Sequence, residues 1–238
     1  MKITKIITMV AGSLAIAGSI AAPSFADGFA SFKQHNTSTQ AFQFTSPGNF
    51  TASTLVDFSF ATDVRSSSSS PTIPANSIIL ASLNLTGTQN APIETLGGFF
   101  VLPVNVTNLT LTANGHTLLS LVGDGAISGQ LNGTSGGASG SQGAGNTVTF
   151  ASDYLDFTNS AGRSFSFSLD NVTPGFTKSG SSLSPFSAII GATFAATPTP
   201  TARFATPEPS SVAGMAFGAF GIMGMVVLRR NRRANSAA

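Results

Sequence analysis

A serine nucleophile is the first chemistry that the sequence suggests, because residues 133–137 read Gly-Thr-Ser-Gly-Gly and match the pattern G-x-S-x-G. In hydrolases that use this pattern, a tight turn between a strand and a helix exposes the serine hydroxyl. Ser135 lies instead in a stretch dominated by Gly and Ser, and no helical periodicity follows it. We therefore do not assign Ser135 as a nucleophile.

Acidic residues offer a second kind of chemistry. Asp153 and Asp156 flank Tyr154-Leu155, and two carboxylates can serve as a glycosidase pair or as oxygen ligands of calcium. Asp124 lies between two glycines and can also suit a calcium loop. Spacing alone selects neither use, and aspartates that form turns are the simpler interpretation.

Metal binding has little support in the sequence. The chain has two histidines, His35 and His116, and no cysteine. Neither histidine stands at a metal-ligand spacing from another histidine, and we interpret His116 as a neutral surface residue. We therefore predict no catalytic residue, no metal and no cofactor, and expect that the protein is not an enzyme.

The elements that must position these residues read as strands. Val56–Phe60 and Phe165–Leu169 alternate apolar and polar residues, and a period of two turns one apolar face toward a core. No segment between the chain ends sustains a helical period. Further strand candidates are Ala41–Thr45, Ile78–Thr86, Phe99–Val106, Thr147–Phe150 and Ala188–Ala195.

A hairpin is the clearest local prediction. Leu109–Ala113 and His116–Leu121 are separated by Asn114-Gly115, a pair that tolerates the positive φ values of a type I′ turn. A two-residue turn pairs Ala113 with His116 and puts Leu111 opposite Leu118.

Three segments look like connections rather than strands. Arg65–Pro74 holds a run of serines and reads as an exposed loop, and Gly123–Asn146 is dense in Gly and Ser. Residues 197–205 alternate Thr and Pro at their start, which favours a stiff spacer. The segment Gly123–Asn146 either divides two sheet regions or forms one long surface loop.

Composition bounds the partners. Between Asp27 and Thr206 there are five basic and eight acidic residues, a net charge near −3, although the whole chain carries +2. Nucleic-acid binding depends on clustered positive charge, and we predict no nucleic-acid partner. Without cysteines the domain has no disulfides, so its stability must come from a packed core.

The N-terminal segment has the composition of a secretory signal peptide. Lys2 and Lys5 precede the apolar run Ile6–Ile20, and Ser24 and Ala26 are the small residues that a signal peptidase requires before its cleavage site. We predict a signal peptide over residues 1–26, cleaved between Ala26 and Asp27.

The C-terminal segment has three parts in order. Pro207-Glu208-Pro209 is followed by the uncharged run Val212–Leu228, which is near the short limit for a membrane-spanning helix. Four arginines follow and would keep that end in the cytoplasm: Arg229, Arg230, Arg232 and Arg233. The two prolines hold the preceding backbone extended, as a protease requires.

This order resembles the PEP-CTERM sorting domain of Gram-negative bacteria over residues 206–233. The resemblance implies that an exosortase-like membrane protease reads Pro207-Glu208-Pro209 and releases or transfers the protein at the cell surface. Thr206 stands where the family often has valine. An ordinary C-terminal anchor with a chance Pro-Glu-Pro is the alternative.

The sequence as a whole predicts an all-β protein, with a β-sandwich of jelly-roll type over residues 27–196, a spacer over 197–205 and the sorting signal over 206–233. We expect an exported structural or adhesive protein of the cell surface or extracellular matrix, held transiently in the inner membrane through a helix over 212–228. Exopolysaccharide is a further candidate partner. A secreted carbohydrate-binding module and a carbohydrate-active enzyme remain the alternatives.

Overall fold

The computed structural model describes residues 28–45, 47–143 and 145–204, and these residues form fifteen strands and no helix. The strand content confirms the all-β prediction. The strands are β1 (Gly28–Gln34), β2 (Phe42–Thr45), β3 (Asn49–Phe60), β4 (Ile79–Gln89), β5 (Glu94–Leu96), β6 (Phe99–Ala113), β7 (His116–Gln130), β8 (Gly136–Ser141), β9 (Val148–Ala151), β10 (Leu155–Asp156), β11 (Ser164–Thr173), β12 (Lys178–Ser179), β13 (Ser182–Leu183), β14 (Phe186–Ala195) and β15 (Thr201–Ala202).

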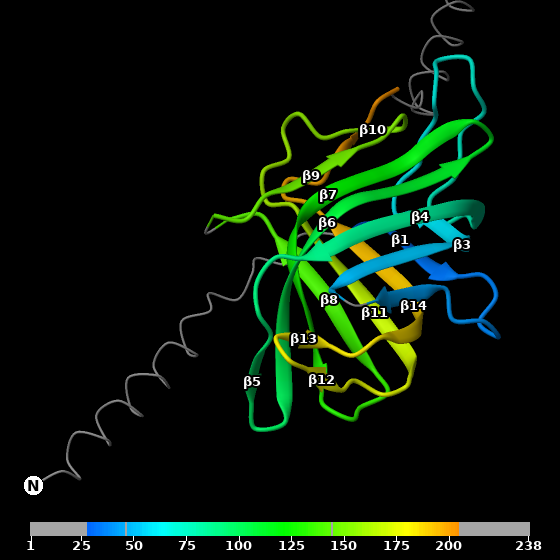
Figure 1. Ribbon diagram of the computed structural model, residues 1–238. Helices are drawn as coiled ribbons and strands as arrows, with labels where there is room; N and C mark the ends of the chain where they lie inside the picture. The colour runs from blue at the N-terminus through cyan, green and yellow to red at the C-terminus, as the bar shows by residue number, and fades with distance from the viewer. Residues whose placement is uncertain (1–27, 46, 144, 205–238) are drawn as a thin grey trace, which may run out of the picture.

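Eight of the strands close into an antiparallel barrel (Figure 1), in the order β6-β4-β3-β1-β14-β11-β8-β7. The long pairing of β6 with β7 closes the circuit. The predicted β-sandwich of jelly-roll type is therefore wrong. Alternation of apolar and polar residues marks one buried face per strand, and this is the same whether two sheets stack or one sheet closes on itself.

Phenylalanine fills the barrel. An eight-stranded barrel is just wide enough for side chains to occupy its interior, and phenylalanine brings large apolar area without a hydroxyl that needs a partner. Near one end Phe29 packs edge to face on Phe150 and Phe157. A second cluster stacks Phe186 on Phe44, at a centroid distance of 5.2 Å. This core supplies the stability that disulfides cannot.

One position in the barrel wall is shared by two strands. β1 and β2 both pair with β3 and β14, at different heights. The buried side chain of Gln34 satisfies the backbone at this break: its Nε2 donates to the carbonyls of Asn36 and Thr39, and its Oε1 accepts from Ile190 N at 3.4 Å. The wall stays hydrogen-bonded where the strand changes.

The predicted hairpin is confirmed between β6 and β7. Asn114 and Gly115 have φ values of 52° and 79°, and Ala113 pairs with His116. The predicted pairing of Leu111 with Leu118 is wrong, because a bulge shifts the register and Leu111 pairs with Leu119. Bulges add one unpaired residue to a strand, and turn chemistry alone does not reveal them.

The stretch Gly123–Asn146, which the sequence predicts as a loop, contains the second half of β7 and all of β8. Its glycines make room for large side chains inside the barrel. A Cβ at Gly140 would lie 2.5 Å from Phe165 Cε1, and one at Gly136 would lie 2.8 Å from Phe176 Cε2. The Gly-rich sequence here marks close packing of strands. Patterns in a single sequence assign such a stretch to a loop.

The predicted spacer begins as part of the fold. Thr197 exchanges hydrogen bonds with Gly162, with N to O distances of 2.9 and 3.0 Å. Ser160 Oγ donates to Pro198 O at 2.9 Å, and β15 pairs with β10. Residues 197–203 thus lie on the barrel up to the edge of the described region.

The predicted processing residues lie outside the described residues. Within residues 28–204, apart from positions 46 and 144, no helix has the length and apolar character needed to cross a membrane. The helix predicted over 212–228 is outside this region, as are Ala26, Asp27, Pro207, Glu208, Pro209, Arg229, Arg230, Arg232 and Arg233.

Candidate functional site

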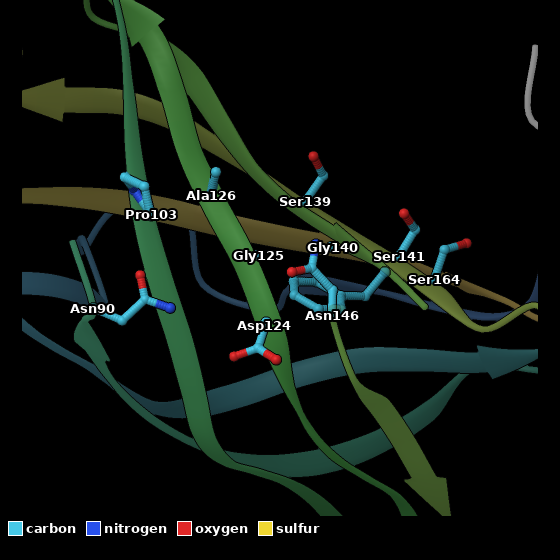
Figure 2. A pocket seen from close by; sticks show the side chains of 11 residues that line it. Asn90, Pro103, Asp124, Gly125, Ala126, Ser139, Gly140, Ser141, Asn146 and Ser164 are labelled. Atoms are coloured by element: carbon cyan, nitrogen blue, oxygen red, sulfur yellow. The ribbon is translucent and has the colours of Figure 1, made fainter. Parts of the chain in front are cut away.

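A hollow of about 480 Å³ opens on the outer wall of the barrel, where β7 and β8 pass between β6 and β11. Figure 2 shows the hydroxyls of Ser139, Ser141 and Ser164 pointing to the same side. The polar residues that line the hollow are Asn90, Asp124, Ser139, Ser141, Asn146 and Ser164.

Asp124 is the one acidic residue among those that line this hollow. Asn105 on β6 is its direct partner across the strands, and Asn105 Nδ2 donates to Asp124 Oδ1 at 2.8 Å. The other carboxylate oxygen accepts from Thr147 N and Thr147 Oγ1, both at 3.1 Å. These bonds, led by the backbone bond from Thr147, hold the pKa of Asp124 below its usual value. The carboxylate is therefore ionised at neutral pH and is fixed in position.

The floor of the hollow is backbone and one buried ring. Gly125 and Gly140 carry no side chain above Phe165, and a Cβ at Gly125 would lie 2.9 Å from Phe165 Cζ. Since Phe165 is 3% exposed, its ring mainly supports the floor from inside. Because a side chain at either glycine would point toward Phe165, the two glycines let this ring pack directly under the backbone of the floor.

The serines on the rim have free hydrogen-bonding capacity. Ser139 and Ser141 are exposed and Ser164 is half-buried. Within the described part of the chain, none of the three hydroxyls has a hydrogen-bond partner. Each hydroxyl can donate and accept, and the Asp124 carboxylate can accept further bonds. The site can therefore bind a ligand rich in hydroxyl groups, and it pairs no nucleophile with a base.

The structure does not bring the G-x-S-x-G serine into this site. Ser135 is exposed in the turn between β7 and β8, and a strand follows it rather than a helix. The neighbouring carbonyls of Gly133 and Thr134 accept backbone bonds from Phe176 and Val172. This segment therefore ties the turn to the end of β11 and the chain that follows it.

The two acids around Tyr154 serve local structure. Asp153 Oδ2 accepts from Thr117 N at 2.7 Å and lies 3.8 Å from His116 Nδ1. Asp156 Oδ1 accepts from both N and Oγ1 of Thr158, and these bonds, the side-chain bond first, lower the pKa of Asp156. The turn interpretation fits Asp156, whereas Asp153 ties its segment to the start of β7, 36 residues earlier in the chain.

The remaining histidine, His35, lies on another part of the wall. His35 Nδ1 is 2.7 Å from Asp57 Oδ1, and Lys33 Nζ is 3.8 Å from Asp57 Oδ2. Across residues 28–204, leaving out 46 and 144, no three His, Asp or Glu side chains gather as a metal site would require.

The sequence pointed to this site only through Asp124 and its flanking glycines. The serines of the rim were missed because they lie in Gly/Ser-rich sequence that resembles a loop. Their signal was the spacing of two between Ser139 and Ser141, and between Ser164, Ser166 and Ser168, which turns serines of one strand to the same face.

The chain matches no protein-family model, no curated protein and no solved structure.

Proposed function

We propose that this protein is exported and acts as a structural or adhesive component of the cell surface or extracellular matrix. In this proposal an exosortase-like protease cleaves it through Pro207-Glu208-Pro209, the following span and the arginines that end at Arg233. The ordered trio of signature, apolar run and arginines supports the proposal, together with the signal peptide before Asp27.

One observation of the barrel supports the adhesive role: its interior is packed, and its outer wall carries few charges and many hydroxyl and amide side chains, beside exposed apolar residues such as Leu55, Leu80 and Val122. On β11 the outward residues Ser164, Ser166 and Ser168 alternate with buried residues, and on β4 Ser82, Asn84 and Thr88 do the same. Hydroxyls and amides form hydrogen bonds without long-range repulsion. Such a wall suits contact with neutral, hydrated surfaces.

The test is a blot of inner-membrane and surface fractions, in a host that has the protease, with one tag on the barrel and one after Arg233. The expected surface protein carries the barrel tag alone. Glu208→Ala should leave membrane insertion intact, because the change lies outside the apolar run, and should reduce processing. Surface protein with both tags, or normal processing when all three signature residues are replaced, would contradict the proposal.

A carbohydrate-binding module is the second candidate, and the hollow beside Asp124 is the observation that favours it. Carboxylates and serine hydroxyls are suitable partners for sugar hydroxyls. The sequence lacks tryptophan and has one tyrosine, so recognition in this candidate depends on hydrogen bonds rather than on an aromatic platform.

A further inference from the structure

Five side-chain hydroxyls stand in register across five neighbouring strands of the barrel wall. We call them the hydroxyl rank. Ser139 on β8 pairs with Ser166 on β11, which pairs with Thr193 on β14. Thr193 pairs with Ser31 on β1, and Ser31 pairs with Ser59 on β3. Four steps between strands span roughly 19 Å along the wall, since adjacent strands lie about 4.8 Å apart.

The rank points outward and is largely unused by the protein itself. Ser139, Ser166 and Thr193 are exposed, and their hydroxyls bond to no other residue in the region that the structure describes. Ser31 Oγ and Ser59 Oγ lie 3.3 Å apart and share one hydrogen bond. Each of these two hydroxyls still has acceptor capacity.

A hollow lies at each end of the rank. Ser139 belongs to the hollow beside Asp124. Ser31, Ser59 and Thr193 line a second hollow of about 200 Å³. Ser166 lies between Ser139 and Thr193 and so joins the two hollows. Together they form one strip that crosses the strands at right angles.

Charge decides what kind of chain the strip can hold. The five residues of the rank are neutral, and Lys33, two residues after Ser31 on β1, is paired: its Nζ lies 3.8 Å from Asp57 Oδ2. Asp57 also contacts His35. Anionic polymers require clustered Arg or Lys for charge-assisted bonds, and Asp124 at one end would repel them. The strip therefore favours a neutral ligand.

We propose that a neutral polysaccharide binds along the hydroxyl rank, with its chain perpendicular to the strands and one segment in the hollow beside Asp124. Sugar hydroxyls donate to the Asp124 carboxylate and exchange hydrogen bonds with the rank. This inference rests on the proposed surface role and deepens it by naming the site and the ligand class.

The test is affinity electrophoresis of the full chain in a mild detergent, through gels that contain dextran, hydroxyethyl cellulose or alginate. At least one of the two neutral polymers should retard the protein, and alginate should not. Ser166→Ile blocks the middle of the rank with a residue that strands favour, and should weaken binding at least roughly tenfold. Thr193→Val removes only a hydroxyl and should weaken it roughly threefold, as for one lost hydrogen bond.

Ser53→Ile is the matched control, because Ser53 is an exposed serine on β3 that lies outside the rank. It should bind like the parent chain. If Ser166→Ile fails to fold, the near-isosteric Thr193→Val decides. No retardation by either neutral polymer, retardation by alginate alone, or equal loss in Ser53→Ile would overturn the site. None of these results depends on C-terminal processing, so failure here is distinct from failure of the surface assignment.

Discussion

At the scale of single residues, glycine and aspartate shape the hollow by different means. Gly125 and Gly140 act through the side chain they lack, which lets Phe165 pack directly under the backbone of β7 and β8. Asp124 acts through the three hydrogen bonds that its carboxylate accepts from Asn105 and Thr147. On β7, packing at Gly125 and hydrogen bonding at the neighbouring Asp124 thus both hold the barrel wall in place.

Gly140→Ala should destabilise the barrel by about 1–3 kcal/mol, the usual cost of overpacking. The new methyl group would lie 2.1 Å from the carbonyl oxygen of Asp124 and 2.5 Å from Phe165. Because the Asp124 carbonyl is part of the backbone, it cannot shift at low energetic cost. Urea denaturation measures the effect. Ser139→Ala, next to it but pointing outward, is the control and should lose less than about 0.5 kcal/mol; equal losses would refute the packing argument.

Asp124 should make the barrel sensitive to acid. Its folded pKa is lowered by the bonds from Thr147 and Asn105, so its stabilising effect is complete above the unfolded value of about 3.9 and is lost as the pH falls through the lower folded value. Asp124→Asn should therefore lower the melting temperature at pH 6 and make a smaller difference at pH 2.5. A difference of the same size at both pH values would show that the carboxylate charge has no part in stability.

At the scale of elements, local sequence patterns predict those strands whose side chains alternate by size and polarity. Val56–Phe60 and Phe165–Leu169 lie in β3 and β11, and the Asn114-Gly115 hairpin is present. β8 was missed because its residues are Gly, Ala and Ser. They are small because of Phe165 and Phe176, which approach from other parts of the chain, so the reason for the pattern is tertiary.

The type I′ turn gives a clean test of backbone conformation. Gly115 has φ of 79°, and a Cβ there would meet no atom within 4 Å. Any loss of stability in Gly115→Val therefore comes from the backbone conformation. We expect a loss of roughly 1 kcal/mol or more, because a β-branched residue resists positive φ. Chemical denaturation of both chains checks it. Gly97→Val offers a comparison at another turn with open space and φ of 58°; no loss at Gly115 would contradict the assigned turn.

Residues 197–204 should contribute to stability rather than act as a passive spacer. A chain that ends at Ala196 lacks the Thr197–Gly162 bonds, the Ser160–Pro198 bond and the β10–β15 pairing. It should melt at a lower temperature than a chain that ends at Phe204. Equal melting temperatures would mean that this segment is only a tether.

At the scale of the whole molecule, barrel closure is the feature that sequence patterns miss. Closure depends on the pairing of β6 with β7 over most of their length and on the shared position of β1 and β2. Both are relations between strands, whereas periodicity reports one strand at a time. The hydroxyl rank has the same origin, since its five residues come from five strands and meet only through register.

We propose that the chain is exported, trimmed at both ends and retained at the surface as a folded barrel. Cleavage near Pro207 would leave Thr197–Ala202 in place on the barrel, so processing and folding are compatible.

Intact-mass spectrometry of the protein recovered from the cell surface tests this claim most directly. We expect a chain that begins at Asp27 and lacks Val212–Ala238. A surface protein with the mass of the complete chain, or one that retains Met1 or the arginines after Leu228, would contradict it.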